Sequence, residues 1–289
     1  MAGAIHVSAP TVLSWVNHFG KNAKSPIEIA RELNPQWGGI LEIDGKSITI
    51  LNQKYAIFIA VDYTTNDPFY FHLAEEEDKE NAQKFFLIIK EVFQYPIRAA
   101  VSDLGKGRVF IELFELIFPG IPHQACVNHF ARYVDIRLPK SKKSKYHELN
   151  EYLRTYIKNI LYAQNFNDAE ELLYRFRRIE HLFVAKYHRE IMRSLRRNFV
   201  LLTRHFFVPD LPRDNNAVEN IIQQLNQKLI QMHGFKNPQN AYNFLKLWFC
   251  ARRFRPFETS KIPHRRKLSS LSLAGVNIKN IDWLKFSQR

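Results

Sequence analysis

Cysteine is scarce in this sequence: only Cys126 and Cys250 occur among its 289 residues. Two cysteines are too few for a disulfide framework or for a four-cysteine zinc site. No apolar run reaches the roughly 18 residues that a membrane-spanning helix needs. The opening stretch MAGAIHVSAP also lacks the basic start and long apolar run of a signal peptide. These absences argue against a disulfide-stapled secreted domain and against a membrane protein, so we expect a soluble cytoplasmic chain.

Charge of one sign dominates what is present. The sequence has 42 Lys and Arg against 28 Asp and Glu, a formal net charge of +14, and 46% of its residues are hydrophobic. Residues 131–208 carry 17 basic and 8 acidic groups, and residues 252–289 carry 10 and 2. A folded chain with two strongly basic segments is suited to a polyanionic partner whose phosphates those segments contact. The alternative is a basic surface that only improves solubility.

The first half of the chain alternates strand and helix patterns. The stretches 41–50, 54–63 and 68–74 are rich in β-branched and aromatic residues, which predicts a meander of three strands with breaks near Gly45 and Asn52. A helix is expected over about 78–95, a buried strand over 96–103 that ends at Asp103, a helix over 106–118 and a short strand over 120–125. A short helix over 7–21 precedes them all.

The second half reads as helices. From about 127 to 207 apolar residues recur at helical spacing among many Lys and Arg, interrupted by the loop LPKSKKSK. A further helix should begin at Asn216 and stop at Gly234, and another should run from Pro238 to about Phe254. The remaining residues suggest a basic, weakly structured tail.

This order of elements allows a mixed sheet. The fourth strand, entered through a helix, can pair parallel to the first by a right-handed crossover. Asp44, expected at the end of the first strand, and Asp103, at the end of the fourth, would then lie side by side at one edge of the sheet. That arrangement is typical of a metal site.

Four stretches carry a specific resemblance: LEIDGKSI, AVSDLGKG, HQACVNHF and DNNAVENIIQQLNQKLIQMHGFKNPQNAYNFL. In this order they resemble the successive signatures of DDE transposases, in the prokaryotic insertion-sequence branch related to Mutator-like elements. The resemblance spans about residues 38–255. It implies an α/β fold with a ribonuclease-H-like mixed sheet, composed of a strand meander plus parallel strands, and an all-helical insertion before the last catalytic helix.

By this resemblance the catalytic residues are Asp44, Asp103 and Glu219, which would hold two Mg²⁺ or Mn²⁺ ions. Two hard cations about 4 Å apart can activate the attacking oxygen and stabilise the leaving one during phosphodiester cleavage, and carboxylates are the usual protein ligands of Mg²⁺. The implied function is metal-dependent DNA strand cleavage and strand transfer. The alternatives are a nuclease of the same fold that joins no strands, and a non-catalytic DNA-binding descendant.

Two further sets of residues complete the expected site. Substrate-orienting roles are expected for Cys126, His129, Asn215 and Asn216, and phosphate contacts for Arg175, Arg177, Arg178, Arg193, Arg196 and Arg197. The partners are then transposon ends and target DNA, bound by a homo-oligomer that associates with the nucleoid and with no membrane. For the pair Cys126 and His129, zinc binding and simple packing stay open as alternatives.

Each acid also has an ordinary interpretation. Asp44 beside Gly45 could belong to a turn, and Asp103 could cap a helix. Asn216, followed three residues later by Glu219, could form a capping box that satisfies the free N–H groups of a helix start. Asp62, at the end of the second predicted strand, we interpret as a structural group or a support of the site, outside the catalytic set.

The expected domain organisation follows these elements. Residues 1–37 would be the remnant of a helix-turn-helix region, in which 7–21 resembles a recognition helix with Ser8, Thr11 and Trp15 in familiar roles; a packing helix is the alternative. The catalytic core would comprise 38–126 and 209–255, the helical insertion 127–208 and the basic tail 256–289. Because the first helices of a helix-turn-helix would need some 30 more residues, we expect N-terminal truncation or a recognition unit encoded elsewhere.

Overall fold

The computed structural model describes residues 8–105, 108–232, 234–260 and 262–289. The chain divides into two compact units, one formed by Met1–Ile97 with Asn216–Arg289 and the other by Arg98–Asn215. Val7 of the first expected helix, residues 106–107 of the expected helix over 106–118 and Lys261 of the tail lie outside the described residues.

The predicted strand meander is confirmed in the first unit. Strands β1 (Ile40–Ile50), β2 (Gln53–Asp62) and β3 (Asp67–Ala74) pair antiparallel in sequence order. The β1–β2 connection is a two-residue turn, because Ile50 pairs with Gln53. Its residues Leu51 and Asn52 have φ values of 48° and 62°, which matches the positive φ that a type I′ hairpin requires at both central positions.

The expected position of Asp44 at a strand end is wrong. Asp44 lies within β1 and pairs with Ile59, and the strand continues for six residues beyond it. Gly45, which suggests a break, instead pairs with Phe58 in the ladder. A side chain there would meet Glu77, since a Cβ atom on Gly45 would lie 3.3 Å from its Oε1 atom. Gly45 therefore occupies a regular strand position rather than a turn.

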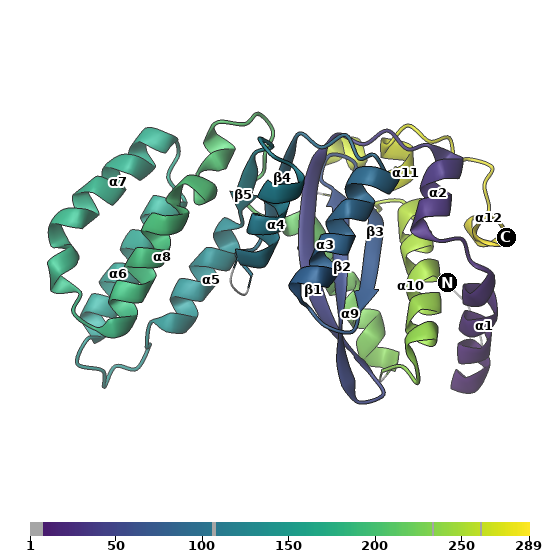
Figure 1. Cartoon of the computed structure of the whole chain (residues 1–289), viewed down its shortest axis with the longest axis horizontal. Coiled ribbons are helices and arrows are strands. Elements are labelled where there is room, and N and C mark those ends of the chain that lie inside the picture. The colour runs from purple at the N-terminus through teal and green to yellow at the C-terminus, as the bar shows by residue number, and fades with distance from the viewer. Residues whose placement is uncertain (1–7, 106–107, 233, 261) are drawn as a thin grey trace. The chain divides into compact units, whose positions relative to one another are not determined.

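Helices cover both faces of this three-stranded part (Figure 1). On one face Ile57 and Ile59 pack with residues of α9 (Asn216–Met232) and α10 (Pro238–Phe254). On the other face Phe85 of α3 (Lys79–Leu87) stacks on Tyr70 and contacts Phe58. A π-helical turn, η1 (Ile88–Val92), continues α3, so the expected helix over 78–95 is present in two parts. The unit is layered as helix, sheet and helix.

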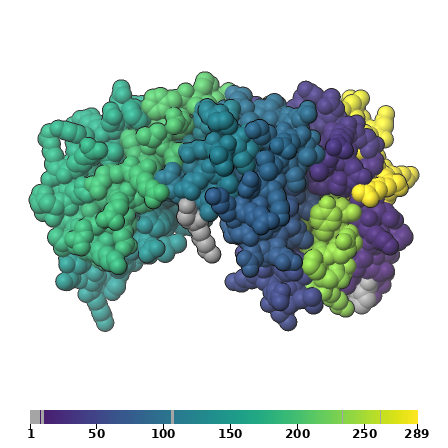
Figure 2. Space-filling view, viewed as in Figure 1, coloured from purple at the N-terminus to yellow at the C-terminus, as the bar shows by residue number. Residues whose placement is uncertain are grey.

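The C-terminal residues are not a loose tail. They contain η5 (Pro263–Arg265), α11 (Ser270–Leu273) and α12 (Trp283–Ser287), and Leu271 packs with Ile29 of α2 (Pro26–Leu33) and with Phe254. In Figure 2 these yellow residues lie against the purple N-terminal helices. The expectation of weak structure is wrong because apolar side chains such as Leu271 anchor a segment with little regular secondary structure.

The first helix, α1 (Ala9–Asn22), begins as expected at Ser8, whose hydroxyl accepts the N–H of Thr11. Its last turn packs on α10, because a Cβ atom on Gly20 would lie 2.7 Å from Asn243. Trp15 lies on the other side of the helix and is 45% exposed. The helix therefore packs by one face and leaves a second face at the surface.

The second unit is mostly helical. It contains β4 (Ala99–Ser102), α4 (Val109–Ile117), β5 (His123–Ala125), α5 (Val127–Arg137), α6 (His147–Leu161), α7 (Phe166–Ile179), η3 (Glu180–Leu182), α8 (Lys186–Leu202) and η4 (Arg204–Phe206). β4 and β5 pair parallel. From residue 127 onward the described residues of this unit form no strand, and one apolar core joins α5 to α8.

The described strands are thus antiparallel in one unit and parallel in the other, which makes the fold a mixed α/β one. Across the described ranges, no helix combines the length and the apolar character needed to cross a membrane.

A buried ion pair joins β3 to α10. Arg253 donates from two nitrogens to the two oxygens of Asp67, each at 2.7 Å, and the Trp37 indole N–H donates to the same carboxylate at 2.9 Å. The side chains of Arg253 and Asp67 are 1% and 0% exposed. A bidentate geometry of this kind offsets the desolvation of both charges.

Replacement of Arg253 by Met should leave the Asp67 charge buried without its guanidinium partner. We expect the free energy of unfolding to fall by about 3–5 kcal/mol, measured by urea denaturation. The double variant with Asp67→Asn should recover part of this loss, because no uncompensated charge stays buried. A loss below about 1 kcal/mol in the single variant would contradict this role, since surface pairs are worth that much.

The two ends of the first unit also meet. Arg289 donates to Glu28 at 2.9 Å, and this bond, with those from Ser25, lowers the pKa of Glu28 to about 2. Because the folded pKa of Glu28 lies below the ordinary value of 4.5, the stabilisation is present above about pH 4.5 and is lost as the pH falls toward 2.

Glu28→Gln should therefore reduce the acid dependence of unfolding between about pH 2 and 4.5, measured by thermal melting at stepped pH. An unchanged pH profile would contradict the assignment.

Candidate active site

Asp44 points to the face of β1 that α9 covers. Side chains alternate along a strand, and Ile48 and Ile50, which share the parity of Asp44, pack with α9 and α10. Glu42 has the same parity and hydrogen-bonds to the N–H of Val218 in α9. The Asp44 side chain is half-buried, and its Oδ1 atom accepts the N–H of Gly45 at 2.8 Å.

Glu219 lies in the first turn of α9, directly after the residue that bonds to β1. Ala217, Val218 and Ile221 are buried against the sheet, whereas Glu219 is half-buried at the helix start. The first unit therefore brings the start of the helix that carries Glu219 to the same sheet face as Asp44.

The hydrogen bond described at this helix start comes from another element than the expected box of Asn216 and Glu219. α9 begins at Asn216, so Glu219 is its fourth residue rather than its third. The N–H of Val218, which a capping side chain would satisfy, donates instead to Glu42 Oε2 at 2.9 Å. By contrast, α2 has a genuine capping box, in which Ser25 and Glu28 exchange hydrogen bonds.

Asp103 belongs to the second unit and directly follows β4, as the sequence predicts. Burial raises the pKa of its carboxyl group above the ordinary value, and the charge of nearby His129 and the Gly105 N–H partly oppose this rise. Asp103 is therefore a half-buried carboxylate beside a histidine.

Cys126 and His129 have different surroundings. Cys126 is the residue before α5, and its buried thiol lies 4.0 Å from Oδ1 of Asp214. That carboxylate also accepts the N–H of Asn128 at 2.9 Å and the Nε–H of Arg213 at 3.1 Å. Within the second unit, Cys126 thus contacts Asp214, and His129 lies near Asp103.

The two asparagines before Glu219 also differ. Asn215 is fully buried, and neither polar atom of its side-chain amide has a hydrogen-bond partner among the described residues. Asn216 is the exposed first residue of α9. A buried amide with unmet hydrogen-bonding capacity is unusual, and it makes Asn215 the more specific candidate for contact with a ligand.

Asp62 has the structural role that the sequence suggests. It is fully buried and accepts hydrogen bonds from Gly39, from the backbone and hydroxyl of Thr65, and from the Tyr95 hydroxyl at 2.6 Å. Both of its oxygens are thereby used within the first unit.

Within the described residues, no group of three or more His, Cys, Asp or Glu side chains is arranged to hold a metal ion. The three expected catalytic acids are divided between the units, with Asp44 and Glu219 in the first and Asp103 in the second. In the first unit the arrangement offers two carboxylates, which are hard oxygen donors of the kind that Mg²⁺ prefers.

A family model described as "Transposase, Mutator family" matches residues 49–239, about two thirds of the chain. The chain belongs to the Mutator family of transposases. Asp103 and Glu219 fall within the matched residues, and Asp44 lies five residues before them. No curated protein matches the chain.

The six arginines expected to contact DNA are all exposed in this Mutator-family chain. They lie on α7 and α8: Arg175, Arg177, Arg178, Arg193, Arg196 and Arg197. Arg175 pairs with Glu171, and Arg196 pairs with Glu180. Arg178 lies over the ring of Tyr174, 5.2 Å from its centre. The six side chains are therefore not equivalent, because two of them already neutralise acids.

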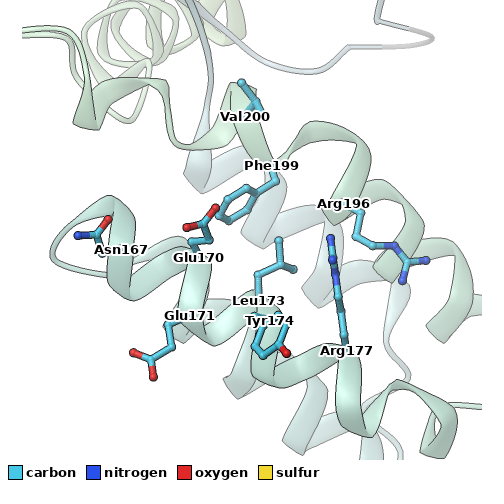
Figure 3. A pocket seen from close by; sticks show the side chains of 9 residues that line it. All are labelled: Asn167, Glu170, Glu171, Leu173, Tyr174, Arg177, Arg196, Phe199 and Val200. Atoms are coloured by element: carbon cyan, nitrogen blue, oxygen red, sulfur yellow. The ribbon is translucent and has the colours of Figure 1, made fainter.

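A groove of about 600 Å³ lies between α7 and α8. Figure 3 shows Glu170 and Glu171 toward one end of the groove and Arg177 and Arg196 toward the other. Acids in the lining disfavour phosphate at that end. The basic character of this surface is thus concentrated on the C-terminal half of α7 and on α8.

Two buried acids near the expected catalytic and substrate-orienting residues were given no role from the sequence. Glu42 is fully buried and bonds to α9, and Asp214 is a buried acceptor beside Cys126. The period-2 pattern of β1 could have identified Glu42, since it places Glu42 and Asp44 on one face. Asp214 opens the stretch DNNAVEN that carries the family resemblance, but nothing in that stretch indicates its contact with Cys126.

Proposed function

We propose that this transposase-family chain cleaves DNA strands and transfers them, with Asp44, Asp103 and Glu219 as its catalytic carboxylates on a ribonuclease-H-like core. The observation that carries the proposal is the shared sheet face of Asp44 and the start of the helix that bears Glu219, fixed by the bond from Val218 to Glu42. Asp103 is added on the resemblance of its motif and on its position directly after β4.

The chemistry of these donors fits Mg²⁺ or Mn²⁺, which bind carboxylate oxygens. When bound, a pair of such ions supplies an activated oxygen nucleophile and charge stabilisation for the leaving group. The chain's part is to present the oxygens of Asp44, Asp103 and Glu219, and to place DNA by phosphate contacts from α7 and α8. Cys126, His129, Asn215 and Asn216 would orient the substrate, and Asn215 offers a buried amide for this.

We further propose that the partners are DNA ends and target DNA, bound in the cytoplasm at the nucleoid.

The main alternative function is that of a nuclease that joins no strands. A strand-transfer assay with a pre-cleaved DNA end separates the two functions, because only a transposase joins that end to a second duplex.

Glu219→Gln tests the catalytic assignment. Removal of one carboxylate charge should lower Mg²⁺-dependent cleavage by roughly 100-fold or more, because charge stabilisation is most of what such a site contributes. The melting temperature should stay near that of the parent. DNA affinity without metal should be unchanged or higher, since a negative charge is gone.

The matched control is Glu112→Gln, which changes an exposed acid in the first turn of α4 and should leave cleavage intact. If the Glu219→Gln variant of an active parent cuts DNA as well as the parent does, Glu219 is not a catalytic residue.

The arginines of α7 and α8 predict a graded dependence of DNA binding on salt. Replacing Arg178, Arg193 and Arg197 by Gln should reduce the log–log salt slope by about 0.9 for each phosphate that is no longer neutralised. Replacing Arg175 and Arg196 should change the slope less, because these two are paired with Glu171 and Glu180. The measurement is binding of a mixed-sequence duplex over a range of salt concentrations. A parent slope near zero would exclude this surface as a DNA contact.

A further inference from the structure

The start of α9 is held by a carboxylate from another element. Glu42 is fully buried in β1, and its Oε2 atom accepts the N–H of Val218 at 2.9 Å, across 176 residues of sequence. Val218 is the third residue of α9. Its N–H is one of the four at a helix start that have no partner within the helix.

Several of the longer described helices meet that need locally, whereas α4, α5, α6 and α8 have no side-chain bond from the residue just before them. In five helices the side chain just before the helix accepts the N–H three residues on: Ser8, Ser25, Asp78, Asn165 and Asn237. In α9 the residue at that position is Asn215, whose side-chain oxygen has no hydrogen-bond partner among the described residues. The capping function therefore passes to Glu42, whose carboxyl oxygen accepts the N–H of Val218.

Burial of a carboxylate costs several kcal/mol unless its bonds compensate, whereas a local serine or asparagine would cap the helix without that cost. The distant cap has a geometric effect that a local cap lacks. It ties the backbone of α9, one residue before Glu219, to a point on β1 two residues before Asp44. Two residues along a strand correspond to about 6.8 Å on the same face.

We propose that Glu42 is a positioning residue, which fixes Glu219 relative to Asp44 so that both carboxylates can bind the same divalent cation. This inference rests on the proposed function of those two acids. Glu42 itself acts through the α9 backbone and not through the ion. Residues that orient metal ligands typically change metal affinity by about 10–100-fold when they are removed.

The test compares Mn²⁺ binding and stability in the full-length chain without DNA. Titration calorimetry gives the Mn²⁺ dissociation constant, electron paramagnetic resonance gives the environment of bound Mn²⁺, and urea denaturation gives stability. Glu42→Ala removes the acceptor and should weaken Mn²⁺ binding by about 10-fold or more. Glu42→Gln keeps an acceptor oxygen and should recover a large part of that loss, because the α9 backbone is again held.

The matched control is Asp62→Asn, which alters a fully buried carboxylate of the neighbouring strand. It should destabilise the chain and leave Mn²⁺ affinity within about twofold of the parent, since Asp62 bonds to Gly39, Thr65 and Tyr95 and not to α9. A role limited to general stability would instead weaken binding equally in both variants, and that result would overturn the proposal.

The Glu219→Gln variant separates this inference from the proposed function. If Glu219→Gln weakens Mn²⁺ binding and Glu42→Ala does not, positioning by Glu42 is wrong and the site assignment stands. If Glu219→Gln leaves Mn²⁺ binding unchanged, the proposed site itself fails. If Glu42→Ala does not fold, the Glu42→Asp variant is measured instead. Its shorter side chain can hold the N–H of Val218 only if α9 shifts relative to β1. Mn²⁺ affinity and a spectrum like those of the parent would then refute the proposal.

Discussion

The buried ion pair between Arg253 and Asp67 determines where α10 lies on the sheet of the first unit. α10 contacts β3 on one side and α1 on another, and the short helices α11 and α12 pack on it as well. Two hydrogen bonds of 2.7 Å and the Trp37 indole restrict the position of the guanidinium more closely than apolar packing alone. Since α9 and α10 share one apolar core with the strands, the same anchor limits where α9 can lie.

The residues of the proposed site come from both compact units. Asp44 and Glu219 are carried by a strand and a helix that are joined by a hydrogen bond and by a common core, whereas Asp103 follows a short strand of the other compact unit. Two of the acids therefore lie on elements that a hydrogen bond and a common core hold together. For the third, burial next to His129 is the observed property.

Much of this fold could be predicted from the sequence, because local patterns determine it. Alternation and turn residues identified β1 to β3. The helical spacing of apolar residues predicted a helical block where α5 to α8 lie, and it predicted the bounds of α9 and α10 to within a few residues. The errors have physical reasons. Gly45 suggests a turn from its type, yet its backbone pairs with Phe58 in the regular ladder of the sheet. The tail seemed unstructured because its few apolar residues, such as Leu271, have no periodicity, although they fill a specific core.

Residues of the proposed site could be predicted from the sequence only where they belong to recognisable motifs. Asp44, Asp103 and Glu219 stand in such motifs. The bond between Glu42 and Val218 depends on how two distant segments meet, and no local pattern encodes it. The ion pair of Arg196 also depends on how two segments meet, because its partner Glu180 lies in η3, before the helix that carries Arg196. The ion pair of Arg175 could have been recognised, because Glu171 lies four residues before it on the same helix.

The discontinuous first unit has a consequence for biosynthesis. Strands β1 to β3 leave the ribosome long before α9 and α10, the helices that cover Ile57 and Ile59. Translation of the intervening residues takes on the order of 10 s at about 5–20 residues per second. During that interval the nascent sheet has an uncovered apolar face, while the continuous segment Arg98–Asn215 already has all the residues of its own core. The inserted unit can therefore fold first, whereas the apolar face of the nascent strands stays uncovered until the C-terminal helices emerge.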